Sequence, residues 1–274
     1  MKCEQIAKHT SVHCIEQLEG RRLLSGVVTA TLDNSGVLLI KGDAANNSIE
    51  VEAASNAGFI RVRGFATAVN GVAFRDFPAS SVRAISIQLD KGNDTAQVHD
   101  LSSGPGGTAP SLNNITATDD AGNDQDYFFT ITLNTGSISA TTGGGFDIVQ
   151  TFNGVAVASL SVNTGSTTDS VSIADTQAAS ASILTGDNND FLQFENDEFG
   201  NLLVDTGKGD DNANFNNVGV ASSINVKLGD GNDYIRCEMV FAGFGVVDGG
   251  SGTDVFEDGG GNAGFSIINF EGFI

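Results

Sequence analysis

The sequence contains no tryptophan, only two tyrosines and only three prolines among its 274 residues. Exposed Trp and Tyr rings are the usual platforms on which sugars and bases stack, so their scarcity argues against an aromatic carbohydrate-binding face. The 18 phenylalanines suit an apolar core instead. Apolar runs of the length that spans a bilayer are missing as well, and we therefore expect no transmembrane helix.

Basic residues are also few, with 13 Lys and Arg against 34 Asp and Glu, for a formal net charge of −21. Nucleic-acid binding requires a basic surface, so this composition excludes nucleic acid as a partner. A strongly acidic chain suits a soluble protein, and equally one that collects cations.

Cysteine and histidine each occur three times, which limits the chemistry they can support. Three cysteines (Cys3, Cys14 and Cys237) cannot all pair, and no CxxC spacing is present for zinc. Cys237 falls in a strand pattern, where we expect a small core residue rather than a nucleophile. His99 is remote in sequence from the other two histidines, so no histidine-centred triad or zinc cluster is predicted.

A repeat of about 22 residues organises most of the chain. An Asp closes a short turn sequence such as GDGND (229–233), and it recurs at intervals of 21 to 23 residues apart from one interval of 30. The longer interval contains the turn-rich insertion SSGPGGTAP (102–110). The recurring residues are Asp94, Asp124, Asp147, Asp169, Asp190, Asp211, Asp233 and Asp254. Such a period is typical of a solenoid.

Apolar and polar residues alternate on both sides of each repeated Asp, which is the pattern of strands with one buried face. Each repeat is thus a strand, a five-residue turn, a second strand and a variable return. We predict an all-β fold, a single right-handed parallel β-solenoid of about ten coils with about 21–22 residues per coil. A degenerate coil is expected between Phe59 and Phe77.

The predicted organisation has four parts. We expect an N-terminal leader at 1–26, degenerate coils at 27–80, regular coils at 81–263 and a C-terminal cap strand at 264–274. Because the repeats need their neighbours to bury an apolar face, the coils should form one domain.

The unbroken column of aspartates raises an electrostatic problem. Equivalent residues of adjacent coils lie ~4.8 Å apart, where two bare carboxylates repel by about 1 kcal/mol in water and about 3–4 kcal/mol at an effective dielectric of about 20. A cation between turns would remove this repulsion, and calcium suits such a place because it accepts many oxygen ligands in loose geometry. The alternative is a metal-free turn, since Gly, Asn and Asp favour tight turns by themselves.

Three of the turns resemble a known family. GGSGTDVFE (249–257) fits the nonapeptide GGxGxDxUx of RTX, or haemolysin-type, calcium-binding repeats, and GDGNDYI (229–235) and GKGDDNA (207–213) fit it except for the first Gly. The resemblance implies several calcium sites between adjacent coils. This chain departs from the family by having one turn motif per 21–22 residues rather than two per coil. The implied ligands are Asp187, Asp190, Asp210, Asp211, Asp230, Asn232, Asp233 and Asp254.

The leader carries a second resemblance. LEGRRLLSG (18–26) is similar to the Leu-Glu-Pro-Arg-x-Leu-Leu segment that opens many large secreted or cell-surface proteins of planctomycete bacteria, with Gly20 in place of Pro. The leader has no apolar stretch of an ordinary signal peptide. The resemblance implies an extracellular or cell-surface location.

Together these observations favour an exported calcium-binding β-solenoid that serves, without catalysis, as a structural or adhesive surface module. Its partners would be calcium and either a surface polysaccharide or another surface protein. The alternatives are a carbohydrate-active β-helix enzyme, similar to polysaccharide lyases or epimerases, and a metal-free structural solenoid. A groove lined by Arg with two or more acids would favour the enzyme.

Overall fold

The computed structural model describes residues 26–274, so the predicted leader lies almost entirely outside the described part of the chain. Within that part the only helical element is the short 3-10 helix η1 (Ala79–Ser81), and the rest is strands and turns. None of its helical structure is long and apolar enough to cross a membrane.

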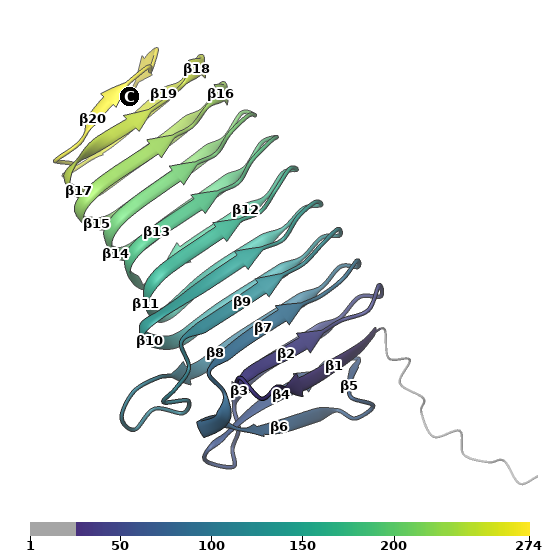
Figure 1. Cartoon of the computed structure of the whole chain (residues 1–274). Coiled ribbons are helices and arrows are strands. Elements are labelled where there is room, and N and C mark those ends of the chain that lie inside the picture. The colour runs from purple at the N-terminus through teal and green to yellow at the C-terminus, as the bar shows by residue number, and fades with distance from the viewer. Residues whose placement is uncertain (1–25) are drawn as a thin grey trace, which may run out of the picture.

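Strands that precede the repeated turns stack in parallel into one ladder along a rod (Figure 1). Their inward residues, such as Ile138, Leu160 and Val226, are buried. The ladder contains β2 (Val37–Lys41), β7 (Ala84–Gln88), β9 (Asn114–Thr118), β10 (Gln125–Thr141), β11 (Ile148–Asn163), β13 (Thr176–Leu184), β14 (Phe191–Asp205), β15 (Asn212–Lys227), β17 (Tyr234–Asp248) and β20 (Ser266–Ile268).

Strands that follow the turns form a second parallel ladder. The long strands β10, β11, β14, β15 and β17 belong to both ladders, because each continues from one face of the rod around to the next coil. The remaining members are β3 (Ser48–Ala53), β8 (Thr95–Ser102), β12 (Ser170–Ala174), β19 (Val255–Gly260) and β21 (Gly272–Phe273). The predicted parallel β-solenoid is therefore confirmed.

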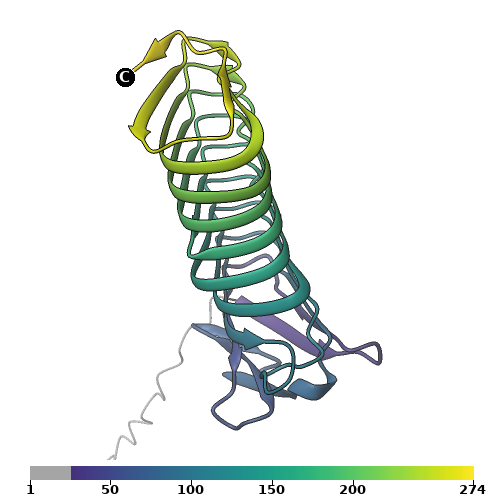
Figure 2. The same cartoon turned by 90° about the vertical axis from the view of Figure 1, so that its left-hand side faces the viewer.

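A residue with positive φ lets each long strand bend from one face to the next. Asn196 and Asn217 take φ values of 57° and 56°, in the left-handed region that Asn tolerates better than most residues. The Asn217 side chain donates its Nδ2–H to Asn196 Oδ1 at 2.9 Å, which ties neighbouring bends together. Figure 2 shows the resulting stack of rounded coils.

The rod makes about seven turns, so the prediction of about ten coils was too high. Each ladder contains ten strands, but at both ends of the rod the chain does not complete a full turn around it. At the C-terminal end, β20 and β21 are short, and they pair with β17 and β19 without completing another coil.

At the N-terminal end the chain runs antiparallel, and the degenerate coil expected between Phe59 and Phe77 was wrong. Here β1 (Gly26–Leu32) pairs antiparallel with β2 and parallel with β5 (Thr67–Val69), while β3, β4 (Phe59–Gly64) and β6 (Phe74–Pro78) form an antiparallel sheet. The Ala54 N–H donates to the Phe59 carbonyl at 2.9 Å and closes the hairpin. Alternation is the same in parallel and antiparallel strands, so the sequence pattern could not separate the two arrangements.

Stacked apolar columns fill the interior of the rod. Phe194 and Phe215, on neighbouring coils, are fully buried with ring centroids 4.5 Å apart and planes inclined by 14°. Cys237 is 1% exposed, as expected for a small core residue. The core is continuous along the solenoid, which agrees with coils that cannot bury their faces alone.

Candidate cation sites

The repeated aspartates form a buried column at the inner edge of the turns. We call these eight residues the Asp column, and none of them is more than 3% exposed. They are buried because the turn reverses the chain tightly enough to aim the closing residue into the rod. The turn itself depends on glycine, since a Cβ on Gly231 (φ 148°) would lie 1.8 Å from the Gly209 carbonyl oxygen of the neighbouring coil.

Each carboxyl group of the Asp column has one satisfied oxygen and one unsatisfied oxygen. The Asp211 N–H donates to Asp233 Oδ1 at 2.8 Å, and the Asp233 N–H donates to Asp254 Oδ1 at 2.8 Å. The same bond links the rest of the column, and Glu271 accepts from the Asp254 N–H where the column ends. In all eight residues Oδ2 is buried without a donor committed to it. Neighbouring threonine hydroxyls lower the pKa of four of these aspartates, but they donate to main-chain carbonyls; they belong to Thr142, Thr164, Thr185 and Thr206.

Burial favours the neutral form of these carboxyl groups. Desolvation raises the pKa of Asp190 and of Asp233 to about 7, although the hydrogen bonds that each accepts act in the opposite direction. The pKa of Asp169 is raised to about 6 for the same reason. A buried oxygen without a donor in a row of like charges needs either a proton or a cation.

The eight predicted calcium ligands divide into two rows with different surroundings. Asp190, Asp211, Asp233 and Asp254 belong to the buried Asp column. The other four are exposed on the solvent side of the turns, where they already make contacts: Asp187 pairs with Lys208 at 3.4 Å, Asp210 Oδ1 accepts from the Asn232 N–H at 2.7 Å, and Asp230 Oδ1 accepts from the Ser251 hydroxyl at 2.7 Å.

The sequence analysis did not identify Asp119 and Asp126 as candidate ligands, although both are buried. Asp119 and Asp126 lie on either side of one turn, at positions where the other coils carry Thr, Gly or apolar residues. All four of their carboxyl oxygens are buried, and no other described residue donates a hydrogen bond to them; the two carboxyl groups contact only each other. Burial, followed by the charges of the neighbouring acids, raises the pKa of both groups. The sequence signal was Asp126 itself, which interrupts an otherwise apolar column.

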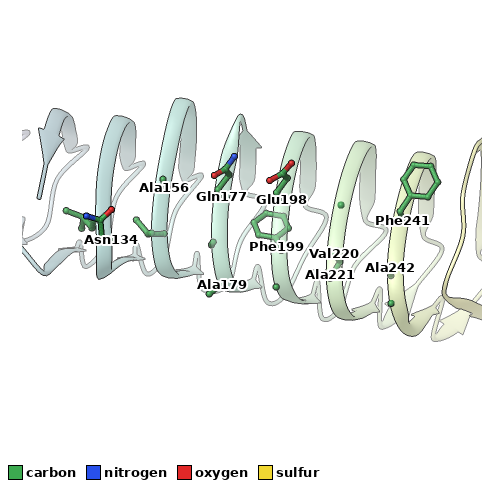
Figure 3. A pocket seen from close by; sticks show the side chains of 16 residues that line it. Asn134, Ala156, Gln177, Ala179, Glu198, Phe199, Val220, Ala221, Phe241 and Ala242 are labelled. Carbon is green, nitrogen blue, oxygen red and sulfur yellow. The ribbon is translucent and has the colours of Figure 1, made fainter. Parts of the chain in front are cut away.

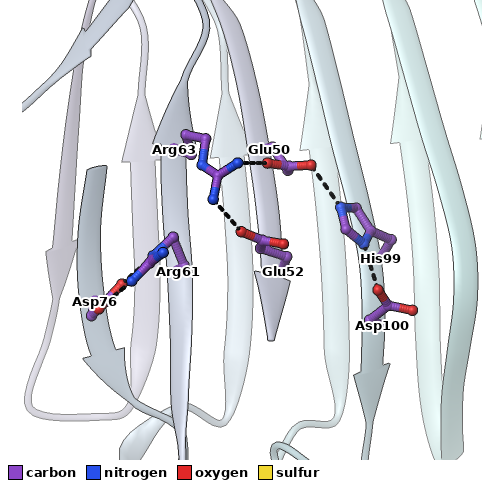
Figure 4. Close-up of polar contacts among 7 residues, drawn as sticks. All are labelled: Glu50, Glu52, Arg61, Arg63, Asp76, His99 and Asp100. Carbon is purple, nitrogen blue, oxygen red and sulfur yellow. Dashed lines mark hydrogen bonds and ion pairs between the residues drawn. The ribbon is translucent and has the colours of Figure 1, made fainter. Parts of the chain in front are cut away.

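A third acidic group lies where the solenoid meets the N-terminal sheet. Glu50, Glu52 and His99 bring three potential ligand atoms within 4.8 Å of one another (Figure 4). However, Arg63 already pairs with Glu50 at 3.4 Å and with Glu52 at 3.0 Å. His99 lies between Glu50 Oε1 at 2.9 Å and Asp100 Oδ2 at 3.0 Å.

The carboxylates of this third group have cationic partners without a metal. Burial opposes protonation of His99, but its hydrogen bonds to Glu50 and Asp100 raise its pKa overall. The raised pKa favours a protonated His99, which together with Arg63 would offset the charges of Glu50 and Glu52, so the ionic cluster is explained by its own residues.

A shallow groove of about 780 Å³ runs along one flank of the rod, across several coils (Figure 3). Its floor is largely apolar, with Ala178, Phe199 and Val220 among its lining residues. Glu198 is the only charged residue in that lining, and Gln177 adds a neutral polar group. The groove therefore lacks the Arg and paired acids that would favour a carbohydrate-active enzyme.

Arg236, the arginine nearest to the Asp column in sequence, lies outside that groove. It is held by Glu257, at 3.0 Å from its Nε, and by Glu238, at 2.5 Å from its Nη2. These ion pairs raise the pKa of Arg236, so it is a fixed cation rather than a base.

Comparison with known protein families, with curated proteins and with solved structures finds no match for this chain. The resemblances to RTX repeats and to the planctomycete leader segment therefore rest on the quoted residues alone.

Proposed function

We propose that the protein is a calcium-stabilised β-solenoid that acts as a structural or adhesive module outside the cell. The observation that carries this proposal is the Asp column, in which every carboxyl group keeps one buried oxygen without a donor. Asp190, Asp211, Asp233 and Asp254 would hold the ions, and bound calcium would supply the positive charge that the interior lacks.

The donor set fits a hard cation. Carboxylate oxygens are the ligands that calcium prefers, and neighbouring coils bring one free oxygen each to the same column. Within the described residues no Lys, Arg or His forms an ion pair with a column aspartate. Calcium is plentiful outside cells, so ion binding would favour the folded rod there.

A structural or adhesive role is supported by the composition of the groove along the flank of the rod. The groove offers an apolar strip with few charges, which suits contact with a surface polysaccharide or another surface protein better than acid–base catalysis. Export is supported by the similarity of LEGRRLLSG to the planctomycete segment. Labelling of intact cells with an antibody against the solenoid tests the location, and a signal seen only after lysis would contradict export.

A calcium titration of the purified protein tests the metal. We expect the melting temperature to rise from chelator to millimolar calcium, because an ion that binds only the folded state stabilises it. Asp233→Asn should weaken the response, whereas Asp175→Asn, which alters an exposed acid at a bend, should leave it unchanged. A melting temperature that is equal in chelator and in calcium would favour the metal-free solenoid.

A further inference from the structure

One coil carries a facing pair of buried acids that belongs to none of the sites above. Asp126 is fully buried and Asp119 is 4% exposed, and their carboxyl groups lie next to each other inside the rod. None of their four oxygens receives a hydrogen bond from any other described residue, so the two carboxyl groups can hydrogen-bond only to each other, through a shared proton. A lone buried acid can be a tolerated defect, but two adjoining acids that no other group hydrogen-bonds form an isolated polar pair inside an apolar rod.

The surroundings of this pair show that the fold does not require acids there. Along its ladder Asp126 lies between Ala96 and Val149, both apolar and buried. The position of Asp119 is taken in the next coil by Thr142, whose hydroxyl donates to the Thr164 carbonyl at 3.2 Å. A threonine at position 119 and a valine at position 126 would thus fill this coil as Thr142 and Val149 fill the next one.

The charged groups that act on both carboxyls of the pair are themselves acids. Asp94 and Asp124 of the Asp column interact unfavourably with both acids. Among residues 26–274 no basic side chain forms an ion pair with any of these four aspartates. Isolated buried charges are very costly, so ionised acids here need a cation beside them.

An acidic surface groove lies directly beside the pair. A groove of about 460 Å³ is lined by Asp119 and by the neighbouring acids Asp90 and Asp120, with Lys41 as its one basic residue. Both neighbouring acids are exposed, so the opening attracts cations from solvent.

We propose that Asp119 and Asp126 bind a single calcium-sized divalent cation inside the solenoid. Two carboxylates that bind through both oxygens supply four ligands, and the cation completes its shell with water or main-chain oxygens. Calcium suits the pair better than magnesium, because magnesium demands a strict octahedron and gives up its water reluctantly. This site is separate from the calcium sites proposed for Asp190, Asp211, Asp233 and Asp254.

Replacement by the residues of the neighbouring coil tests the pair. The variant Asp119→Thr/Asp126→Val should be at least as stable as the unaltered protein in chelator, because it removes buried acids without leaving a cavity. It should lose the part of the calcium response that this site supplies, a rise in Tm of about 5 to 10 °C at free calcium about 100-fold above Kd. If the variant folds poorly, Asp119→Asn/Asp126→Asn keeps the shape and removes the charge.

A matched control comes from another buried acid. Both carboxyl oxygens of Asp197 accept backbone N–H groups, from Thr176 at 2.9 Å and Glu195 at 3.0 Å. Asp197→Asn should therefore leave the calcium response unchanged, although it also removes a buried carboxyl group.

Terbium luminescence locates the ion, since the chain has no tryptophan and only two tyrosines as sensitisers. Tyr127 follows Asp126 in the sequence, and Tyr234 follows Asp233 in the Asp column. Terbium bound at the internal pair should be sensitised by Tyr127, so Tyr127→Phe should abolish most of that signal. Terbium at the column near Asp233 should lose its signal in Tyr234→Phe.

The outcomes separate this inference from the proposed function. Loss of a calcium-dependent Tm shift in both pair variants, with loss of the Tyr127 signal, supports the internal site, even if Asp233→Asn has no effect. An undiminished calcium shift in the pair variants overturns the internal site and leaves the Asp column proposal standing. A protein that binds neither calcium nor terbium overturns both, and identifies the pair as carboxyl groups kept neutral by protons.

Discussion

At the scale of single residues, the fold depends on side chains that repeat in register. The Asp column shows how one residue type serves two purposes: Oδ1 continues the hydrogen bonding of the turn, while Oδ2 stays free. A threonine column runs beside it, in which the Thr185 hydroxyl donates to the Thr206 carbonyl at 3.3 Å. Polar columns inside the rod are thus largely satisfied by the next coil, and the free Oδ2 atoms are the exception.

Removing one ring from the phenylalanine stack tests how tightly the interior is filled. Phe215→Ala should lower the free energy of unfolding by about 3–5 kcal/mol, because a fully buried ring leaves a cavity and loses its contact with Phe194. Phe191→Ala is the control, since that ring is 43% exposed and should cost well under half as much. Urea unfolding measures both, and equal costs would contradict a filled core at Phe215.

At the scale of elements, the junction between the N-terminal antiparallel sheet and the parallel ladders carries a dense set of ion pairs. Strand β3 belongs to both parts, because it pairs antiparallel with β4 and parallel with β8. Glu50 on β3 contacts Arg63 on β4 and His99 on β8, so one carboxylate links the two arrangements. The ring of His99 also stacks on Phe129 of the next coil at 4.5 Å.

The protonation of His99 is expected to stabilise this junction. Its pKa in the folded protein lies above the ordinary value of about 6.5, so the stabilisation is complete below that value and is lost as the pH rises through the folded-state pKa. Glu50→Gln should lower the pKa of His99, because it replaces a charged acceptor by a neutral one. An NMR titration of the imidazole signals measures this shift.

The control for the histidine titration is Glu198→Gln, which removes a carboxylate from the flank groove on a distant coil. It should leave the His99 signals unmoved. A His99 pKa at or below the ordinary value in the unaltered protein would show that His99 does not offset the charge of Glu50. The cluster of Glu50, Glu52 and His99 would then be a candidate metal site again.

At the scale of the whole molecule, the Asp column couples the stability of the rod to pH and to cations. Several column carboxyls have folded-state pKa values near 7, among them Asp124 and Asp190, above the ordinary unfolded value of about 3.9. Between about pH 4 and pH 7 the folded chain therefore binds more protons than the unfolded chain. The free energy of unfolding accordingly falls as the pH rises through that window.

In chelator, we expect the melting temperature to be higher at pH 5 than at pH 8 by about 5 °C or more, because several buried groups contribute in the same direction. Calcium should reduce this difference by stabilising the ionised carboxylates. Thermal melts at both pH values, with and without calcium, measure the effect. The variant Asp190→Asn/Asp233→Asn should show a smaller difference, and a chelated protein that gains stability towards pH 8 would contradict buried neutral aspartates.

The sequence by itself determined the solenoid, because a strand period of two and a repeat near 22 residues leave only stacked coils as a way to bury one face. It placed Ile138, Val226 and Cys237 inside, and the structure buries all three. The regularity of the repeat made these positions predictable, since each coil presents the same pattern to its neighbours.

Only the tertiary structure decided three other features. The direction of β4 and β6 depends on a hairpin that alternation does not encode, and this removed a coil from the N-terminal end. The separation of a buried Asp column from the exposed Asp187, Asp210 and Asp230 depends on how the turn orients consecutive residues. The meeting of Asp119 with Asp126 depends on a turn that folds two strands of one coil against each other, a contact in space that the sequence shows only as two acids seven positions apart.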